Sequence, residues 1–358
     1  MTFQETTLKD TTLADFGWTS FFDTQIDHDE TTDFTPARVI AVHRDSLHVA
    51  GPGVDRLIRA FSGSEDDDEA AATVGDWLLL DRDALRPRRL LRRKSLFKRR
   101  AAGSGRRLQL IAANVDTLFI VSSCNHDFNT ARLERYLALA RDTDVMPLMV
   151  LTKADLCDDP ESYARQARAL MPGLLVEPMD ARGTDPVDRL APWCARGQTV
   201  ALAGSSGVGK STLINTLLGE QKIASQGIRE DDSKGRHTTS ARTLHRLPGR
   251  GWLLDTPGMR ELQLTDSQAG IEDVFADLAD LARACRFADC RHETEPGCAV
   301  KAALDAGTID ADRLRRWRKL VAEDIRNSES IAQRRARDRA FGRMIKGVQK
   351  SRQRREHP

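Results

Sequence analysis

The sequence lacks any long hydrophobic run. None of its segments reaches the roughly 18 consecutive apolar residues that a membrane-spanning helix needs. The first ten residues have neither the basic start nor the apolar run of a secretory signal. We therefore expect a cytoplasmic protein with no membrane partner. The hydrophobic share of 40% excludes a wholly disordered chain, and 358 residues suffice for two or three domains.

Cysteine is scarce and unevenly placed. Three of the six cysteines are scattered, but the other three share a window of 14 residues with one histidine. In a chain expected to be cytoplasmic, this favours a metal site over disulfides. Three thiolates and one imidazole form the closed ligand set of a structural zinc ion, whereas a catalytic site keeps a position open. The predicted ligands of one structural zinc are Cys285, Cys290, His292 and Cys298. The alternative is three thiols beside a chance histidine.

The formal net charge of +2 conceals charged blocks of both signs. Residues 1–33 carry an acidic excess, whereas residues 82–107 carry 12 Lys and Arg against one Asp. The chain from Arg313 onward has about ten more basic than acidic residues. Two basic blocks on a nearly neutral chain indicate a polyanionic partner such as RNA, although each block could instead be a solvated surface.

The sequence pattern changes several times along the chain. Short β-like runs separated by turns indicate a small barrel or sandwich, with an oligonucleotide-binding (OB) barrel as one candidate. Further on, strands alternate with helices, which predicts a mostly parallel sheet covered on both faces. We therefore expect a multidomain chain with these parts: an acidic flexible extension (1–33), a small β-barrel or sandwich (34–103), an α/β domain (104–265), a mainly helical domain with the predicted zinc ligands (266–325) and a basic tail (326–358).

A phosphate-binding loop is the strongest motif. GSSGVGKST matches the G-x-x-x-x-G-K-[ST] pattern, with an apolar strand before it and a helical run after it. Glycines let backbone N–H groups surround the phosphates, and the helix N-terminus adds its positive end. Lys210 should reach the outer phosphates and Ser211 should ligate Mg²⁺. The residues predicted to bind the nucleotide here are Gly204, Ser205, Ser206, Gly207, Val208, Gly209, Lys210, Ser211 and Thr212.

Two further loops have the pattern of guanine recognition. Thr152, Lys153, Ala154 and Asp155 match [NT]-K-x-D at the end of an apolar strand. An aspartate accepts hydrogen bonds from guanine N1–H and its 2-amino group, a pair that adenine does not offer. Lys153 would lie along the purine face. Asp180 and Ala181, after the next strand, are the predicted second loop that contacts the base.

The order of the motifs is permuted. The sequence DTPG, from Asp255 to Gly258, matches the D-x-x-G switch in which the carboxylate approaches Mg²⁺ and the glycine N–H approaches the γ-phosphate. In most GTPases the phosphate loop comes first and the guanine loop last. Here the guanine loops come first, so we predict a P-loop GTPase domain with a circularly permuted motif order.

The switch lacks the glutamine that orients water in Ras-like enzymes, because Met259 stands in its place. Intrinsic hydrolysis should therefore be slow. His237 is the candidate that replaces it, since an imidazole can hydrogen-bond water at neutral pH. A threonine beside it, either Thr238 or Thr239, would ligate Mg²⁺ and sense the γ-phosphate.

Together these motifs resemble the ribosome small-subunit-dependent GTPase A (RsgA) family, from about residue 34 to about 320. The specific matches are TKAD, GSSGVGKST, GRHTT, DTPG and CRFADCRHETEPGC. The resemblance implies an OB barrel, a permuted GTPase domain and a zinc domain in that order. It implies GTP and GDP binding with Mg²⁺, and GTP hydrolysis stimulated by the small ribosomal subunit during its late maturation. It also implies rRNA contacts by the barrel and zinc domain, a catalytic role for His237, and Thr239 rather than Thr238 as the threonine of the first switch.

Two alternatives remain at this stage. The chain could be a P-loop ATPase or small-molecule kinase, although the TKAD motif argues against adenine. It could also be a nucleic-acid-binding zinc protein that only senses guanine nucleotides. We expect a monomer in either case.

Overall fold

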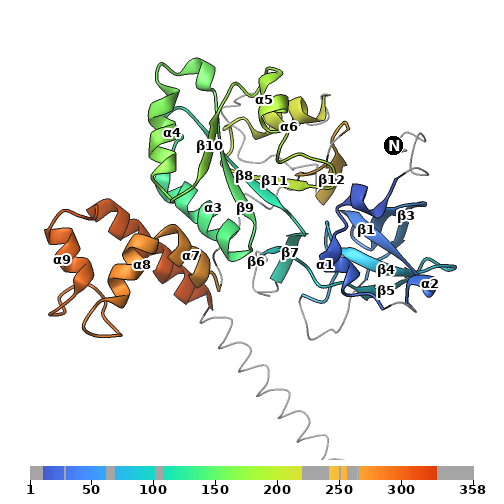
Figure 1. Ribbon diagram of the computed structural model, residues 1–358, viewed down its shortest axis with the longest axis horizontal. Helices are drawn as coiled ribbons and strands as arrows, with labels where there is room; N and C mark the ends of the chain where they lie inside the picture. Colours follow the sequence, from blue (N-terminus) through green and yellow to red (C-terminus); the bar gives the residue numbers. More distant parts are fainter. Residues whose placement is uncertain are drawn as a thin grey trace, which may run out of the picture. The chain divides into compact units, whose positions relative to one another are not determined.

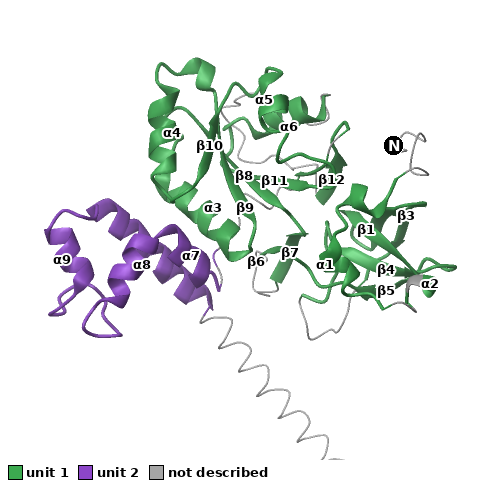
Figure 2. Ribbon diagram, viewed as in Figure 1, with its two compact units in different colours: residues 1–263 green, residues 264–358 purple. Residues whose placement is uncertain are grey.

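The computed structural model describes residues 11–27, 30–61, 69–100, 108–219, 242–249, 251–255, 264 and 266–328. The chain divides into two compact units, residues 1–263 and residues 264–358 (Figure 2). Among the described helices, none is long and apolar enough to cross a membrane.

The centre of the first unit is a parallel sheet with the order β10-β9-β8-β11-β13. Its strands are nearly all apolar, as expected where helices cover both faces of a sheet. In β8, for example, every residue is buried. The bounds are β8, Thr117–Ser123; β9, Met146–Thr152; β10, Leu175–Pro178; β11, Thr199–Ala203; β13, Trp252–Asp255.

Helices lie on both sides of this sheet, with α3 and α4 on one side and α5 and α6 on the other (Figure 1). Asn129 caps α3 by accepting a hydrogen bond from the Arg132 N–H, and Asp159 caps α4 in the same way from Ser162. The bounds are α3, Thr130–Asp142; η2, Ala154–Leu156; α4, Pro160–Arg168; α5, Asp185–Arg189; α6, Lys210–Leu218. The alternation of strands and helices confirms the predicted α/β fold.

Antiparallel strands make up the N-terminal part of the first unit. They pair in the order β3-β2-β1-β4-β5, which agrees with the predicted run of short strands. A separate antiparallel pair, β6 and β7, follows. The bounds are β1, Phe34–Val42; β2, Ser46–Gly51; β3, Val54–Arg59; β4, Trp77–Asp81; β5, Pro87–Leu90; β6, Leu96–Arg100; β7, Leu108–Ala113. The more specific assignment to an OB barrel stays a prediction.

One strand joins the two parts of this unit into a single sheet. The strand β12, Arg242–Arg246, pairs antiparallel with β13 on one side and with β1 on the other. Ala41 of β1 lies opposite Thr243 of β12. A buried cation supports the same junction: Arg38 of β1 donates to the Phe16 carbonyl (2.6 Å) and to the Thr199 hydroxyl (2.8 Å). Burial lowers the pKa of Arg38 to about 10.

The acidic N-terminal segment is not the flexible extension that its composition predicted, at least over residues 11–27. It forms two short helices, η1 (Leu13–Phe16) and α1 (Ser20–Asp23), and a third short helix, α2 (Glu30–Asp33), precedes β1. Phe16 and Phe22 are fully buried, and Phe16 stacks on Trp252 with ring centroids 5.4 Å apart. The burial of these aromatic side chains therefore orders the segment despite its polar composition.

The second unit is helical among its described residues, as predicted. Its helices are α7 (Gln268–Val274), α8 (Ala276–Arg283) and α9 (Ala299–Asp305), and residues 311–328 are also helical. Leu314, Trp317 and Leu320 are buried, and their spacing of three residues places them on one face of that last helix. The basic tail from residue 329 lies outside the described residues.

Candidate nucleotide site and metal cluster

The phosphate loop follows β11 and ends at the N-terminus of α6, as the motif requires. Two of its glycines are needed for their backbone. Gly204 has φ +147, and a Cβ there would lie 2.2 Å from the Val121 carbonyl oxygen. Gly209 has φ +93 and caps α6, with Thr152 against it. These positions therefore exclude other residues, and the loop can hold its conformation beside β8 and β9.

Lys210 is folded back into the loop. Its side chain is buried, and its ammonium group donates to the carbonyl of Gly204 at 2.7 Å and to that of Ser205. The cation is thereby held at the centre of the loop. Ser211, the next residue, is half-buried in the first turn of α6.

Thr152 connects the guanine loop to the phosphate loop. Its side chain is completely buried, and its hydroxyl lies 2.5 Å from the Val208 carbonyl and 3.1 Å from that of Ser122. A hydroxyl has one proton and donates to one of these oxygens at a time. The position expected to support the base thus supports the phosphate loop.

The two predicted base loops lie together at the carboxyl ends of β9 and β10. The Ala154 N–H donates to the Met179 carbonyl (3.3 Å), and the Thr216 hydroxyl of α6 donates to the Ala181 carbonyl (2.7 Å). Lys153 has the left-handed φ of 57, uncommon for a residue with a side chain. In open α/β sheets, ligands bind beyond the carboxyl ends of the strands. The structure therefore brings the phosphate loop and both base loops together at the expected edge.

Arg182 is the site residue that sequence reasoning missed. Its guanidinium donates to Asp155 and to Asp180, the two acidic side chains of the base loops. Hydrogen bonds from the Arg182 side chain and N–H lower the pKa of Asp180. The only sequence signal was its position directly after Ala181 in the second loop.

The switch residues are only partly described. Asp255 is half-buried at the end of β13, next to β11. Outside the described residues lie His237, Thr238, Thr239, Gly258 and Met259.

The predicted metal ligands come together in the second unit. Their ligand atoms all lie within 4.8 Å of one another. The Cys285 and Cys298 sulfurs are 3.8 Å apart, and each is 3.5 Å from the His292 Nδ1. Bond lengths of about 2.3 Å to sulfur and about 2.1 Å to nitrogen imply tetrahedral edges of about 3.8 and 3.6 Å around zinc. The separations among Cys285, His292 and Cys298 match these edges, and with Cys290 beside them the cluster is consistent with a structural zinc ion.

The surroundings of the cluster fix its ligands. Cys298 caps α9, where its sulfur accepts the Lys301 N–H at 3.3 Å. The backbone carbonyl of His292 accepts a hydrogen bond from Arg318. The ring centroids of His292 and Trp317 are 5.5 Å apart. The helix of residues 311–328 thus supports the histidine from outside the ligand window.

Part of the first basic block is paired with acidic residues within the protein. Arg93 bonds the fully buried Asp76 at 2.7 Å, Lys94 bonds Asp116 at 3.0 Å, and Arg89 bonds Glu30 at 2.7 Å. These ion pairs weaken the inference from charge alone, because acidic residues far away in the sequence compensate the block.

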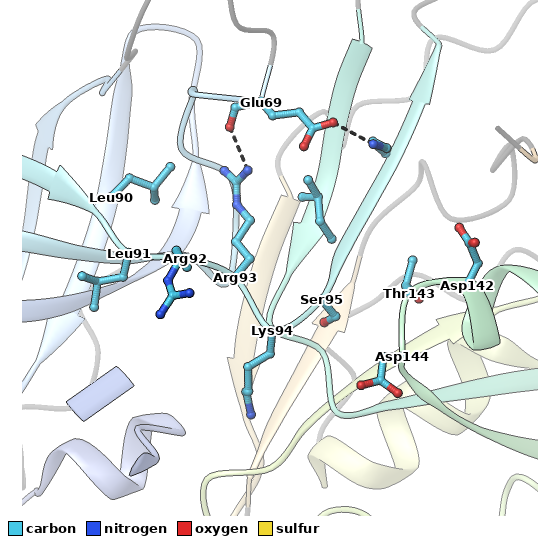
Figure 3. Close-up of a pocket in the computed structure, with 12 residues that line it drawn as sticks. Glu69, Leu90, Leu91, Arg92, Arg93, Lys94, Ser95, Asp142, Thr143 and Asp144 are labelled. Carbon is cyan, nitrogen blue, oxygen red and sulfur yellow. Dashed lines mark hydrogen bonds and ion pairs between the residues drawn. The ribbon is translucent and has the colours of Figure 1, made fainter. Parts of the chain in front are cut away.

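A cavity of about 600 Å³ lies beside the first basic block (Figure 3). Four cations and three carboxylates line it: Arg92, Arg93, Lys94 and Lys98, with Glu69, Asp142 and Asp144. Glu69 engages two of these cations, through its carbonyl to Arg93 and its carboxylate to Lys98. This mixed lining does not favour a simple polyanion site.

Comparison with known proteins decides the family. The model of a family described as RsgA GTPase matches residues 90–265. The chain is 47% identical over 344 residues to the small ribosomal subunit biogenesis GTPase RsgA 2 of Vibrio parahaemolyticus, covering 96% of this chain and 94% of that protein. The chain belongs to the RsgA GTPase family. Another RsgA, from Mesorhizobium japonicum, is 50% identical over 320 residues, covering 88% of this chain and 91% of that protein.

Solved structures show the same fold. The crystal structure of YjeQ from Thermotoga maritima matches with a TM-score of 0.59 at 24% identity, over 81% of this chain and 98% of that one. The structure of YloQ, described as a circularly permuted GTPase, matches with a TM-score of 0.56 at 23% identity, over 83% and 97%. This RsgA chain is therefore a GTP hydrolase with a permuted fold, which decides against an ATPase or small-molecule kinase.

Proposed function

We propose that this RsgA GTPase binds the small ribosomal subunit late in its maturation and hydrolyses GTP there. The observation that carries this proposal is identity of about half of all residues to two small ribosomal subunit biogenesis GTPases, over more than nine-tenths of their lengths. Its partners would be the small subunit with its rRNA, and GTP or GDP. The chain would act in the cytoplasm as a monomer.

The phosphate loop would bind GTP with Mg²⁺. Lys210 would exchange its two loop carbonyls for the outer phosphate oxygens, which are stronger acceptors because they are charged. Ser211 and Thr239 would ligate Mg²⁺. The buried bond between Thr152 and Val208 would keep the loop in shape while Lys210 changes partners.

Asp155 would select guanine by accepting hydrogen bonds from N1–H and the 2-amino group. Lys153 would cover one face of the base, and Ala181 would contact its edge. The support is the position of both loops beside the phosphate loop, joined by backbone bonds and by Thr216 of α6.

Hydrolysis would depend on the ribosome. Asp255 and Gly258 would respond to the γ-phosphate, and Met259 cannot orient water because a thioether is a poor hydrogen-bonding group. His237 would position the water once subunit contact orders the first switch. Phosphoryl transfer needs mainly such positioning and charge stabilisation.

The regions on either side of the GTPase domain would bind the rRNA. We place an OB-like RNA-binding region at residues 34–103, the permuted GTPase domain at 104–265 and the zinc domain at 266–325. The extension 1–33 and basic tail 326–358 would flank them. Zinc supplies rigidity to a segment with few apolar residues of its own, and the Arg-rich tail adds electrostatic affinity.

Co-sedimentation tests this proposal. The chain is mixed with purified small or large ribosomal subunits, with GDP or with a non-hydrolysable GTP analogue. We expect it to migrate with small subunits in the analogue, and far less in GDP. Lys210→Ala should lose this dependence on the nucleotide. Equal binding to both subunits, or to neither, would contradict the proposal.

A further inference from the structure

In the proposed guanine-binding loops, Arg182 contacts Asp155, the carboxylate that we propose recognises guanine. Arg182 Nη2 donates to Asp155 Oδ2 and, at 3.1 Å, to Asp180 Oδ2. Its Nε donates to Asp180 Oδ1 at 3.0 Å. Asp155, the residue proposed to recognise guanine, is therefore already part of an ion pair.

Arg182 and guanine offer the same chemistry to Asp155. The guanine edge N1–H, C2 and 2-amino group is a planar guanidine-like fork of N–H donors, as is an arginine side chain. Both groups suit the two oxygens of a carboxylate. Arg182 in this position is an internal substitute for the guanine edge.

Asp180 is a second hydrogen-bond partner for the Arg182 side chain. It accepts both the Arg182 Nε and the Arg182 backbone N–H, each at 3.0 Å. Neither bond involves Asp155. The Arg182 side chain is 64% exposed, so a small rotation of its end meets little packing. Asp180 also contributes more than Asp155 to the raised pKa of Arg182.

We propose that Arg182 sets the affinity for guanine nucleotides by competing with guanine for Asp155. In the empty site Arg182 pairs with both carboxylates, and guanine displaces it onto Asp180. This inference rests on the proposed role of Asp155. Its consequence is weaker binding of GDP and GTP alike, because each binding event breaks the ion pair between Arg182 and Asp155.

Removing Arg182 should tighten binding, opposite to the effect of losing a supporting residue. An ion pair between exposed side chains is weak, so Arg182→Ala should lower the Kd for GDP only roughly three- to fivefold. The probe is GDP with an N-methylanthraniloyl group on its ribose. The gain in affinity for GDP should shrink between about 50 and 200 mM salt because salt screens exposed charges.

Two further variants complete the test. Arg182→Lys should have a Kd for GDP between those of the wild type and Arg182→Ala. Arg168→Ala, which breaks an exposed pair with Glu161 on α4, is the matched control and should leave the Kd unchanged.

A double-variant cycle isolates the competition. Asp180→Asn weakens the alternative partner of Arg182, so it should raise the Kd for GDP in the wild-type chain. In the Arg182→Ala chain it should have almost no effect. An Arg182→Ala variant that melts normally but binds GDP equally or more weakly overturns the inference, as does additivity in the cycle.

Asp155→Asn separates this inference from the proposed function. Asparagine can donate to the 2-oxo group of xanthine, so the variant should prefer xanthosine diphosphate over GDP. If it does while Arg182→Ala fails to tighten GDP binding, base reading stands and the inference fails. If Asp155→Asn keeps the preference of the wild type, both fail.

Discussion

A single carboxylate anchors the N-terminal segment to the nucleotide-binding part of the chain. Asp15 pairs bidentately with Arg196, one oxygen accepting from Nε and the other from Nη2 at 2.6 Å. Its backbone carbonyl accepts the Trp252 indole N–H at 2.8 Å. The Arg196 hydrogen bond holds the pKa of Asp15 well below its usual range against a smaller opposing effect of burial.

We expect Asp15→Asn to destabilise the chain by about 1–2 kcal/mol at pH 7. This is the free energy of a hydrogen bond between charged groups, reduced because the Arg196 side chain is exposed to solvent. Because the folded-state pKa is depressed, this stability is present above the usual value of 3.8 and is lost as pH falls through the folded-state pKa. Urea unfolding at pH 7 and at about pH 2.5 should show a smaller difference from wild type at the lower pH. Asp27→Asn, an exposed residue of the same segment, is the control; a gap independent of pH would refute the role of the pair.

At the scale of single residues, the sequence predicted positions better than partners. Lys210 and the four Cys/His ligands could be named because a short spacing fixes their chemistry. The bond from Thr152 to Val208 spans 56 positions in the sequence and depends on how two strands align. The pairing of Arg182 with Asp155 spans 27. No local pattern encodes such contacts.

At the scale of elements, the phosphate loop depends on its neighbouring strand. Thr152 ends β9 and reaches Val208 in the loop that follows β11, while β8 lies between the two strands. The loop is therefore fixed from the side as well as by its own glycines.

Thr152→Val should test this lateral support. Valine has nearly the same shape but leaves the buried Val208 carbonyl without its donor, so the variant should lose about 1–3 kcal/mol of stability. Its Kd for GDP should rise several-fold because the loop loses its tie. Thermal unfolding and titration with GDP measure both effects.

Thr143→Val is the matched control for that variant. The Thr143 hydroxyl lies 2.9 Å from the Leu139 carbonyl and 3.1 Å from that of Ala140, at the far end of α3 and away from the phosphate loop. It should leave GDP binding unchanged. Equal effects of the two variants on GDP binding would mean that Thr152 has no specific role in the loop.

Elements within the basic block were harder to predict than the apolar ones. Strands β8, β9, β11 and β13 were evident from their apolar runs. Strands β5 and β6 lie in the run of 12 basic residues, where charge hides the pattern. The N-terminal segment was misjudged because its acidic residues outnumber the few aromatic side chains that it buries.

At the scale of the whole molecule, the chain is two compact units, one with the nucleotide loops and one with the Cys/His cluster. In the first unit a continuous sheet runs from the strand of the second base loop to the N-terminal strands, through β12. The permuted order was predictable from the motifs, because each motif marks one strand end. The pairing of β12 with β1 was not, because the sequence shows only that both are short strands.

Metal content tests the second unit. We expect one zinc per chain, and Cys290→Ser should abolish most of it and lower the thermal stability of residues 264–358. Guanine nucleotide binding, which belongs to the first unit, should persist. Cys157→Ser, a half-buried cysteine outside the cluster, should keep its zinc. Undiminished zinc in Cys290→Ser would refute the assigned ligand set.

The most direct test of the central claim is steady-state GTP hydrolysis with purified small or large ribosomal subunits, at about 50 and 200 mM salt, a range over which phosphate contacts weaken strongly. The account predicts slow turnover alone and a large, salt-sensitive stimulation by small subunits only. His237→Ala should lose that stimulation while keeping GTP affinity. Bound GTP with equal turnover in the presence and absence of small subunits would contradict the account.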